Sequence, residues 1–266
     1  MCATCGCGED HQHFREDDRE HRRHFVRADD HHHHHEDDHH HHRADRARTI
    51  AFEEAVLARN QHLAAHNRAE LRAREVVAIN LMSSPGAGKT TLLERTLASL
   101  AGALPLAVIE GDQETQADAD RIRAAGGRAV QINTGTGCHL DAAMVGRALE
   151  ELDPRGGILF IENVGNLVCP ALFDLGEAVR VVIASVTEGE DKPLKYPHMF
   201  RAAELVLLNK IDLLPYVEFS VDRFAANAHQ VNPRARILPL SARSSEGVPA
   251  WLGFLRDHSS SDRAIG

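Results

Sequence analysis

Short apolar runs alternate with longer amphipathic stretches along the chain from residue 76 onward. The apolar runs predict seven strands, at 76–82, 105–110, 128–132, 157–162, 179–186, 204–209 and 236–240. The stretches between them predict helices near 89–101, 115–125, 140–152, 194–203, 220–230 and 247–257. This alternation is typical of an α/β fold, with a mostly parallel sheet of about seven strands and helices on both faces. Ligands of such sheets bind at the carboxyl ends of the strands.

The chain before residue 76 has a different pattern. Residues 45–74 place apolar side chains such as Ile50, Leu57 and Leu71 at roughly helical spacing, which predicts one long helix or two short ones. Residues 9–42 contain almost nothing apolar, and we expect them to be disordered. We therefore divide the chain into a cysteine motif (1–8), a disordered His- and acid-rich segment (9–42), a helical segment (43–75), an α/β domain (76–258) and a disordered C-terminus (259–266).

Charge is concentrated at the N-terminus. Residues 1–42 hold 11 Asp and Glu, 5 Arg and 13 of the 19 His, and they carry −6 of the net charge of −9. The acidic balance argues against general nucleic-acid binding. No apolar run approaches the ~20 residues of a membrane span, and no secretory signal is visible. Five cysteines without such a signal favour reduced thiols and metal chemistry, so we expect a cytoplasmic protein.

The strongest functional signal is SSPGAGKTT at 83–91, between a predicted strand and a predicted helix. A phosphate-binding loop requires this context, because glycines let backbone N–H groups close on phosphate oxygens. The Lys89 ammonium can reach the β- and γ-phosphates, and the Thr90 hydroxyl can bind Mg²⁺. Ser83 stands where the generic pattern has glycine, which leaves a plain glycine turn as the alternative. The predicted nucleotide-binding residues of this loop are Ser84, Pro85, Gly86, Ala87, Gly88, Lys89, Thr90 and Thr91.

Two further strands end in carboxylates. Asp112 follows the second predicted strand, where it can hold Mg²⁺ and orient the attacking water; the alternative is a helix N-cap. Glu162 ends the fourth strand, GILFIE, close to where Mg²⁺ and the γ-phosphate would lie. Gly165 is placed to donate its N–H to the γ-phosphate. We therefore assign catalytic roles to Lys89, Asp112 and Glu162, and Mg²⁺ binding to Thr90, Asp112 and Glu162.

The sixth strand ends in Asn209-Lys210-Ile211-Asp212, which matches the N-K-x-D pattern of guanine-specific GTPases. The Asp212 carboxylate can accept hydrogen bonds from guanine N1–H and the exocyclic amine. Adenine lacks this donor pair and would leave the carboxylate unpaired. Ser241-Ala242 after the seventh strand resembles the element that contacts the guanine oxygen. The chain is therefore predicted to bind GTP.

Cysteines and histidines form three candidate metal sites. Cys138-His139 follows the third predicted strand and Cys169 follows the fourth, so their side chains can meet beside the nucleotide. They can form a metal-transfer site or a metal site completed by a second subunit. The alternative is that the cysteines are buried and structural. Cys2, Cys5 and Cys7 can form a compact thiolate site, unless they are incidental. The repeated histidines of the His-rich segment are suited to storage of Ni²⁺, Cu²⁺ or Zn²⁺. The alternatives are a tail that only improves solvation, or an expression tag. The storage ligands are His31, His32, His33, His34, His35, His39, His40, His41 and His42.

Together these motifs resemble the HypB family of hydrogenase nickel-incorporation GTPases, P-loop GTPases of the SIMIBI class. The resemblance covers 45–257 and the N-terminal CATCGC. It rests on SSPGAGKTTLL, EGDQET, NTGTGCHLD, ILFIENVGNLVCP, SVTEGEDKPLKYPHMF and LLNKIDLLPY. Ser83 is normal for this family, and Ser84 stands where the deviant Walker A ATPases have lysine.

The resemblance implies a metal-dependent GTP hydrolase that acts as a nickel metallochaperone in [NiFe]-hydrogenase maturation. It implies a homodimer that depends on nucleotide and metal, with a HypA-like nickel protein and the hydrogenase large-subunit precursor as partners. It assigns a Ni²⁺ or Zn²⁺ site to Cys138, His139 and Cys169, and a tighter nickel site to the N-terminal cysteines. Hydrolysis is expected to be slow, because no arginine finger is obvious.

Three other functions compete with this one. A urease-type nickel GTPase would use a Cys-Pro-His triplet, whereas Cys138-His139 and Cys169-Pro170 are separate here. A P-loop small-molecule kinase is disfavoured by the N-K-x-D motif. A non-catalytic nickel or zinc storage protein would show neither GTP turnover nor a nucleotide effect on metal binding.

Overall fold

The computed structural model describes residues 38–112, 117–135 and 137–261. The chain separates into two compact units, residues 1–56 and 57–266. The predicted cysteine motif and nearly all of the predicted His-rich segment lie outside the described residues. No helix within the described ranges is both long and apolar enough to cross a membrane.

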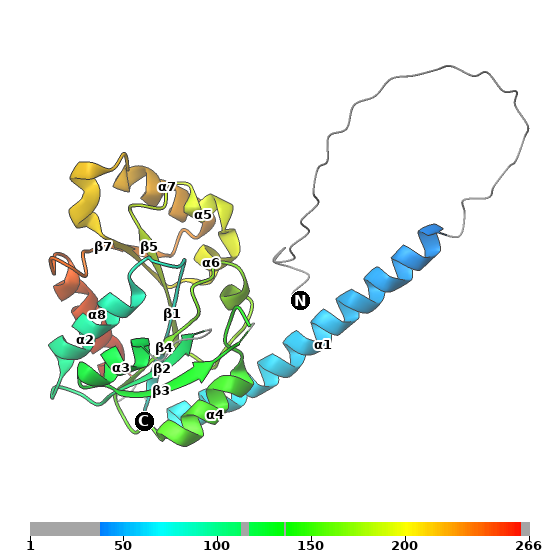
Figure 1. The fold of residues 1–266 in the computed structure, drawn as a ribbon, viewed down its shortest axis with the longest axis horizontal. Helices are drawn as coiled ribbons and strands as arrows, with labels where there is room; N and C mark the ends of the chain where they lie inside the picture. The colour runs from blue at the N-terminus through cyan, green and yellow to red at the C-terminus, as the bar shows by residue number, and fades with distance from the viewer. Residues whose placement is uncertain (1–37, 113–116, 136, 262–266) are drawn as a thin grey trace, which may run out of the picture. The chain divides into compact units, whose positions relative to one another are not determined.

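A seven-stranded parallel sheet forms the centre of the second unit (Figure 1), as predicted. The strand order is β3-β2-β4-β1-β5-β6-β7. The bounds are β1 Val77–Ser83, β2 Leu106–Asp112, β3 Arg128–Asn133, β4 Ile158–Glu162, β5 Val179–Ser185, β6 Leu205–Asn209 and β7 Arg236–Pro239. Parallel strands buried on both faces appear as continuous apolar runs in the sequence, and these runs predicted the strands.

Helices cover both faces of the sheet (Figure 1). Side chains from α2 (Lys89–Leu100), α3 (Ala117–Ala124) and α8 (Val248–Ser261) pack on one face, around Phe160 and Trp251. The other face is covered in two parts, by the end of α1 (Asp38–Ala73) with α4 (Ala142–Leu152), and by α6 (Pro197–Ala202) with α7 (Val221–Val231). Successive residues of β1 therefore pack against different helices, as the pleat of a strand requires.

Two local predictions were wrong in detail. The helix expected at 194–203 is divided into α5 (Lys192–Lys195) and α6, because Pro197 has no backbone N–H and disfavours a helical conformation at Tyr196. Short 3₁₀ helices, η1 (Cys169–Ala171) and η2 (Ile211–Tyr216), were not predicted. Each of these short helices follows a strand and contains a proline, Pro170 in η1 and Pro215 in η2, and proline disfavours a longer helix.

The ends of the helical region also differ from the expected boundaries. Helix α1 is one continuous helix that begins at Asp38, within the segment predicted to be disordered up to residue 42. Its Ala-, Arg-, Leu- and Glu-rich sequence favours extension of an established helix. Helix α8 continues to Ser261, beyond the expected helix end near 257 and into the C-terminus that was expected to be disordered from 259. There the Ser259 hydroxyl donates to the Arg256 carbonyl at 2.9 Å, which satisfies an acceptor of the last turns.

Candidate functional site: a nucleotide pocket beside a Cys-His-Cys cluster

The phosphate loop joins the end of β1 to the start of α2. Gly86 and Gly88 have φ angles of +72° and +96°, which L side chains rarely adopt. The Lys89 ammonium donates to the Ser83 hydroxyl at 2.9 Å. The Ser84 hydroxyl oxygen is buried and has no hydrogen-bond partner within the described parts of the chain. The loop is therefore shaped for close approach of an anion, with the positive end of α2 directed at it.

Asn209, at the end of β6, connects this loop to the loops that follow β6 and β7. Its side-chain amide is buried and donates from Nδ2 to the Ala87 carbonyl at 2.9 Å. Its Oδ1 accepts from the backbone N–H of Lys210 at 2.8 Å and of Ala242 at 3.0 Å. Gly88 is required here because a Cβ would lie 2.5 Å from Asn209 Nδ2. The Asn209 side chain thus holds together the phosphate loop, the loop after β6 and the loop after β7, which the sequence predicted as separate motifs.

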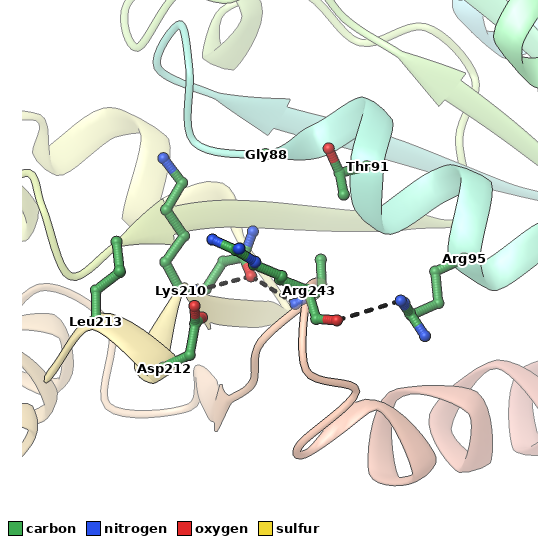
Figure 2. A pocket seen from close by; sticks show the side chains of 9 residues that line it. Gly88, Thr91, Arg95, Lys210, Asp212, Leu213 and Arg243 are labelled. Carbon is green, nitrogen blue, oxygen red and sulfur yellow. Dashed lines mark hydrogen bonds between the residues drawn. The ribbon is translucent and has the colours of Figure 1, made fainter.

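A cavity of about 470 Å³ lies between these loops, and Figure 2 shows its lining. Lys210 has a φ of +64°, and its ammonium donates to the Gly86 carbonyl at 2.7 Å. The Asp212 carboxylate lies at the cavity, and its Oδ1 is buried without a hydrogen-bond partner among the residues that the structure describes. Burying a carboxylate oxygen is costly unless a donor reaches it. A bound base with an N–H group would supply that donor.

Three residues that line the cavity were not assigned a nucleotide-binding role from the sequence: Arg95, Leu213 and Arg243, the last of which follows Ser241-Ala242 in the element after the seventh strand. Arg95 lies on α2, and its guanidinium donates to the Arg243 carbonyl at 3.2 Å (Figure 2). It also donates to the Ser245 hydroxyl. Leu213 and Arg243 directly follow predicted base-binding residues, so proximity in sequence could have indicated them. Arg95 is separated from both motifs, and nothing in the sequence marks it.

Side chains with hard oxygen atoms stand at the end of β2, the end of β4 and the start of α2. The Thr90 hydroxyl donates to Glu162 Oε1 at 2.7 Å, and Asp112 is the last residue of β2, beside β4 in the sheet. Gly165 lies against the phosphate loop, since a Cβ there would be 3.1 Å from Pro85 Cα. A hydroxyl and two carboxylates are the ligands that Mg²⁺ prefers, so these residues fit the ion.

The loops after β3 and β4 bring Cys138, His139 and Cys169 together. Their ligand atoms all lie within 4.8 Å of one another. Cys138 and His139 are half-buried, and Cys169, in η1, is buried. Burial lowers the pKa of His139 below its ordinary value, although Asp141 opposes this, and the neutral imidazole is the form that binds metal. Thiolate and imidazole ligands suit Ni²⁺ and Zn²⁺.

Neighbouring groups hold this cluster in place. The His139 ring stacks on Phe173, with ring centroids 4.0 Å apart. Asn60 of α1 accepts from the Ala142 N–H and donates to the Asp174 carbonyl, each at 2.8 Å. Asn67, two turns further along α1, donates to the Ala142 carbonyl at 2.8 Å and to the Leu175 carbonyl at 3.1 Å. Helix α1 therefore fastens both cysteine-bearing loops just beyond the cluster.

Comparison with known proteins places this geometry in a family. A family model described as "CobW/HypB/UreG, nucleotide-binding domain" matches residues 77–239. Hydrogenase maturation factor HypB of Escherichia coli K12 is 49% identical, over 96% of this chain and 98% of its own length. The chain belongs to the HypB family. HypB of Azotobacter vinelandii is 60% identical over 79% of this chain and 69% of its own length.

Solved structures of HypB proteins share the fold. HypB from Archaeoglobus fulgidus matches with a TM-score of 0.71 and 42% identity, over 76% of this chain and 99% of its own. HypB from Helicobacter pylori, solved in complex with nickel, matches with a TM-score of 0.72 and 38% identity, over 77% and 96% of the two chains. The predicted family and the P-loop GTPase fold are thus confirmed.

Proposed function

We propose that this member of the HypB family hydrolyses GTP to GDP and phosphate and delivers nickel during hydrogenase maturation. The observation that carries the proposal is the position of the Cys138–His139–Cys169 cluster. Its ligand atoms lie within 4.8 Å of one another, and Cys169 lies on the same loop as Gly165, which packs against the phosphate loop. A nucleotide that orders this loop changes the surroundings of a metal ligand. The nickel complex of the Helicobacter pylori relative supports nickel as the ion.

Guanine recognition supports GTP over ATP. The buried Oδ1 of Asp212 faces the cavity and lacks a donor among described residues, and guanine offers two N–H donors there. Mg²⁺ bound by Thr90, Asp112 and Glu162 would neutralise charge on the phosphates, and Lys89 would hold the β- and γ-phosphates. Lys89, Asp112 and Glu162 then position GTP and its attacking water. We expect slow turnover.

Metal delivery requires that nucleotide and metal affect each other. GTP and Mg²⁺ draw Gly165 and the carboxylates toward the phosphates, and this rearranges the loops that carry the cluster. Because linkage is reciprocal, Ni²⁺ changes nucleotide affinity by the same factor. Three protein ligands leave a position open, which suits either transfer to a partner or completion by a second subunit of a dimer. Zn²⁺ competes for the same site.

The remaining assignments also belong to the proposal. Cys2, Cys5 and Cys7 would bind nickel tightly, and the His-rich segment would store it. A HypA-like nickel protein and the hydrogenase large-subunit precursor would be the partners, in the cytoplasm. The high identity to hydrogenase maturation factors over nearly the whole chain supports these partners over those of a urease-type protein.

The test is a nickel titration of the full-length chain in which the proposed N-terminal ligands, Cys2, Cys5, Cys7 and the nine storage histidines, are changed to serine. Ni²⁺ is titrated against a competing chelator in GDP and in a non-hydrolysable GTP analogue, and the Cys138→Ala and Lys89→Ala variants serve as controls. We expect an affinity that depends on the nucleotide, and a loss of that dependence in both variants. Equal nickel affinities in the two nucleotides would show that the site is not gated and would favour the storage function.

A further inference from the structure

Asn163 joins the nucleotide side of the site to the metal cluster. It directly follows Glu162, and its side chain is 1% exposed. Its Oδ1 accepts two backbone hydrogen bonds, from Leu140 at 3.2 Å and from Val164 at 3.0 Å. Leu140 follows Cys138-His139, and Val164 precedes Gly165. One oxygen atom therefore holds the metal loop and the loop that faces the phosphates.

Leu140 is constrained from a second direction. Its side chain is fully buried and lies over Gly111, where a Cβ would be 2.9 Å from three Leu140 carbon atoms. Gly111 precedes Asp112 at the end of β2. The residue next to His139 is thus packed against one nucleotide-facing strand end and hydrogen-bonded to the other. Movement of either strand end must be accommodated at the Cys138–His139 pair.

A buried polar chain fixes the orientation of the Asn163 amide. Its Nδ2 donates to Asn80 Oδ1 at 3.4 Å, and Asn80 Nδ2 donates to Glu177 Oε1 at 3.3 Å. Glu177 in turn accepts from the Leu175 N–H at 2.7 Å and from Arg180 Nε at 2.5 Å. With Nδ2 turned toward Asn80, Oδ1 can face only the two N–H groups. Fully paired buried networks of this kind hold one defined arrangement.

We infer that Asn163 is a positioning residue that transmits the nucleotide state to Cys138 and His139. The inference rests on the proposed function, in which GTP and nickel binding are coupled. A γ-phosphate that accepts from the Gly165 N–H fixes the peptide between Val164 and Gly165. That peptide is adjacent to the Val164 N–H, and the Val164 and Leu140 N–H groups both donate to Asn163 Oδ1. The loop beside Gly165 is already packed on Pro85, so displacement there passes to Asn163.

The experiment measures a ratio of affinities, because a purely structural role would weaken nickel binding equally in both nucleotide states. Full-length protein with Cys2, Cys5, Cys7 and the nine storage histidines changed to serine is titrated with Ni²⁺ in GDP and in a non-hydrolysable GTP analogue. The variants are Asn163→Ala, which removes the shared acceptor, and Asn80→Ala, which removes only the partner of Nδ2. Asn232→Ala is the distant control, since Asn232 also bonds several backbone carbonyls, including that of Ala203 at 2.8 Å.

We expect the unsubstituted site to change nickel affinity by about fivefold or more between the two nucleotides. Asn163→Ala should bring the ratio to about one, Asn80→Ala, which frees the Asn163 amide to turn, should lower the ratio part of the way, and Asn232→Ala should keep it. A ratio that survives in Asn163→Ala overturns the role of Asn163 and leaves the proposed function intact. If the protein that keeps Asn163 already shows the same nickel affinity in both nucleotides, the proposed gating is wrong and this inference is wrong with it.

A second measurement does not depend on the stability of any variant. Hydrogen exchange of the Leu140 amide is followed in the unsubstituted full-length chain, in GDP and in the GTP analogue. Because its acceptor is Asn163 Oδ1, we expect its protection to differ between the two states, while the Asn232-bonded turn at 200–203 stays constant. Equal protection of Leu140 in both states would overturn the inference.

Discussion

Replacement of Asp212 by asparagine should reverse the base preference of the nucleotide pocket. Asp212 Oδ1 is buried and lacks a hydrogen-bond partner in the described part of the chain. Guanine supplies two N–H donors to this carboxylate, and each hydrogen bond to a charged group contributes about 1.5–3 kcal/mol. Asparagine keeps one acceptor oxygen and turns an amide donor toward the other N–H group, so one bond is lost, which costs about 1.5–3 kcal/mol and corresponds to a fall of about 10–100-fold in affinity.

The assay is isothermal titration of the full-length protein with GDP and with xanthosine diphosphate. Xanthine carries a carbonyl where guanine carries the amine, so an asparagine amide can donate to it. We expect Asp212→Asn to lose GDP affinity by about 10–100-fold and to bind xanthosine diphosphate more tightly than the original chain does. Tyr216→Ala is the matched control, because Tyr216 ends the same short helix and is 83% exposed.

The reasoning would be refuted by an Asp212→Asn protein that is folded and binds GDP as tightly as the original. The base would then not contact this carboxylate, and the cavity between α2 and η2 would have another occupant. A loss of affinity for both nucleotides would instead indicate that the substitution damages the pocket as a whole. Thermal unfolding without nucleotide separates these results.

Three further predictions follow from contacts of single residues. Gly88→Ala should lower GDP affinity at least about tenfold in titrations, because its Cβ would displace the Asn209 amide. Asn67→Ala should lower the free energy of unfolding in urea by about 2–4 kcal/mol, since two carbonyls lose their donor. Burial raises the pKa of the Asp174 carboxyl, but its hydrogen bond and ion pair with Arg68 outweigh this and hold that pKa below its ordinary value. The cost of Arg68→Gln, about 1 kcal/mol at neutral pH, should therefore disappear as pH falls through that lowered pKa.

Most of the sheet could be predicted because its strands are buried on both faces. Runs such as ILFIE at β4 and LVLLN at β6 contain no polar residue before their last position, so their limits are visible in the sequence. The helices after β5 were harder to predict. Pro193 suits the first turn of one short helix and Pro197 starts the next, and local propensity does not show how the chain bends between them.

The candidate site was partly predictable for a related reason. Parallel strands end at one edge, so residues after β3 and β4 were expected to meet, and Cys138, His139 and Cys169 do lie together. The groups that hold them were missed. Asn80 is a single polar residue inside an apolar strand, and Asn67 lies between His66 and Arg68 in a largely polar helix, so neither is marked as structural in the sequence. Only the tertiary structure shows that both are buried and hydrogen-bonded.

The strand order has a consequence for biosynthesis. Strand β1 carries the phosphate loop and pairs only with β4 and β5. The first of these partners begins about 80 residues later, so at about 5–20 residues per second β1 emerges from the ribosome several seconds before it can pair. For that interval the nascent chain exposes the apolar sequence VAINLM, and aggregation or chaperone binding competes with folding. The phosphate loop is thus translated well before the strands that hold it in place.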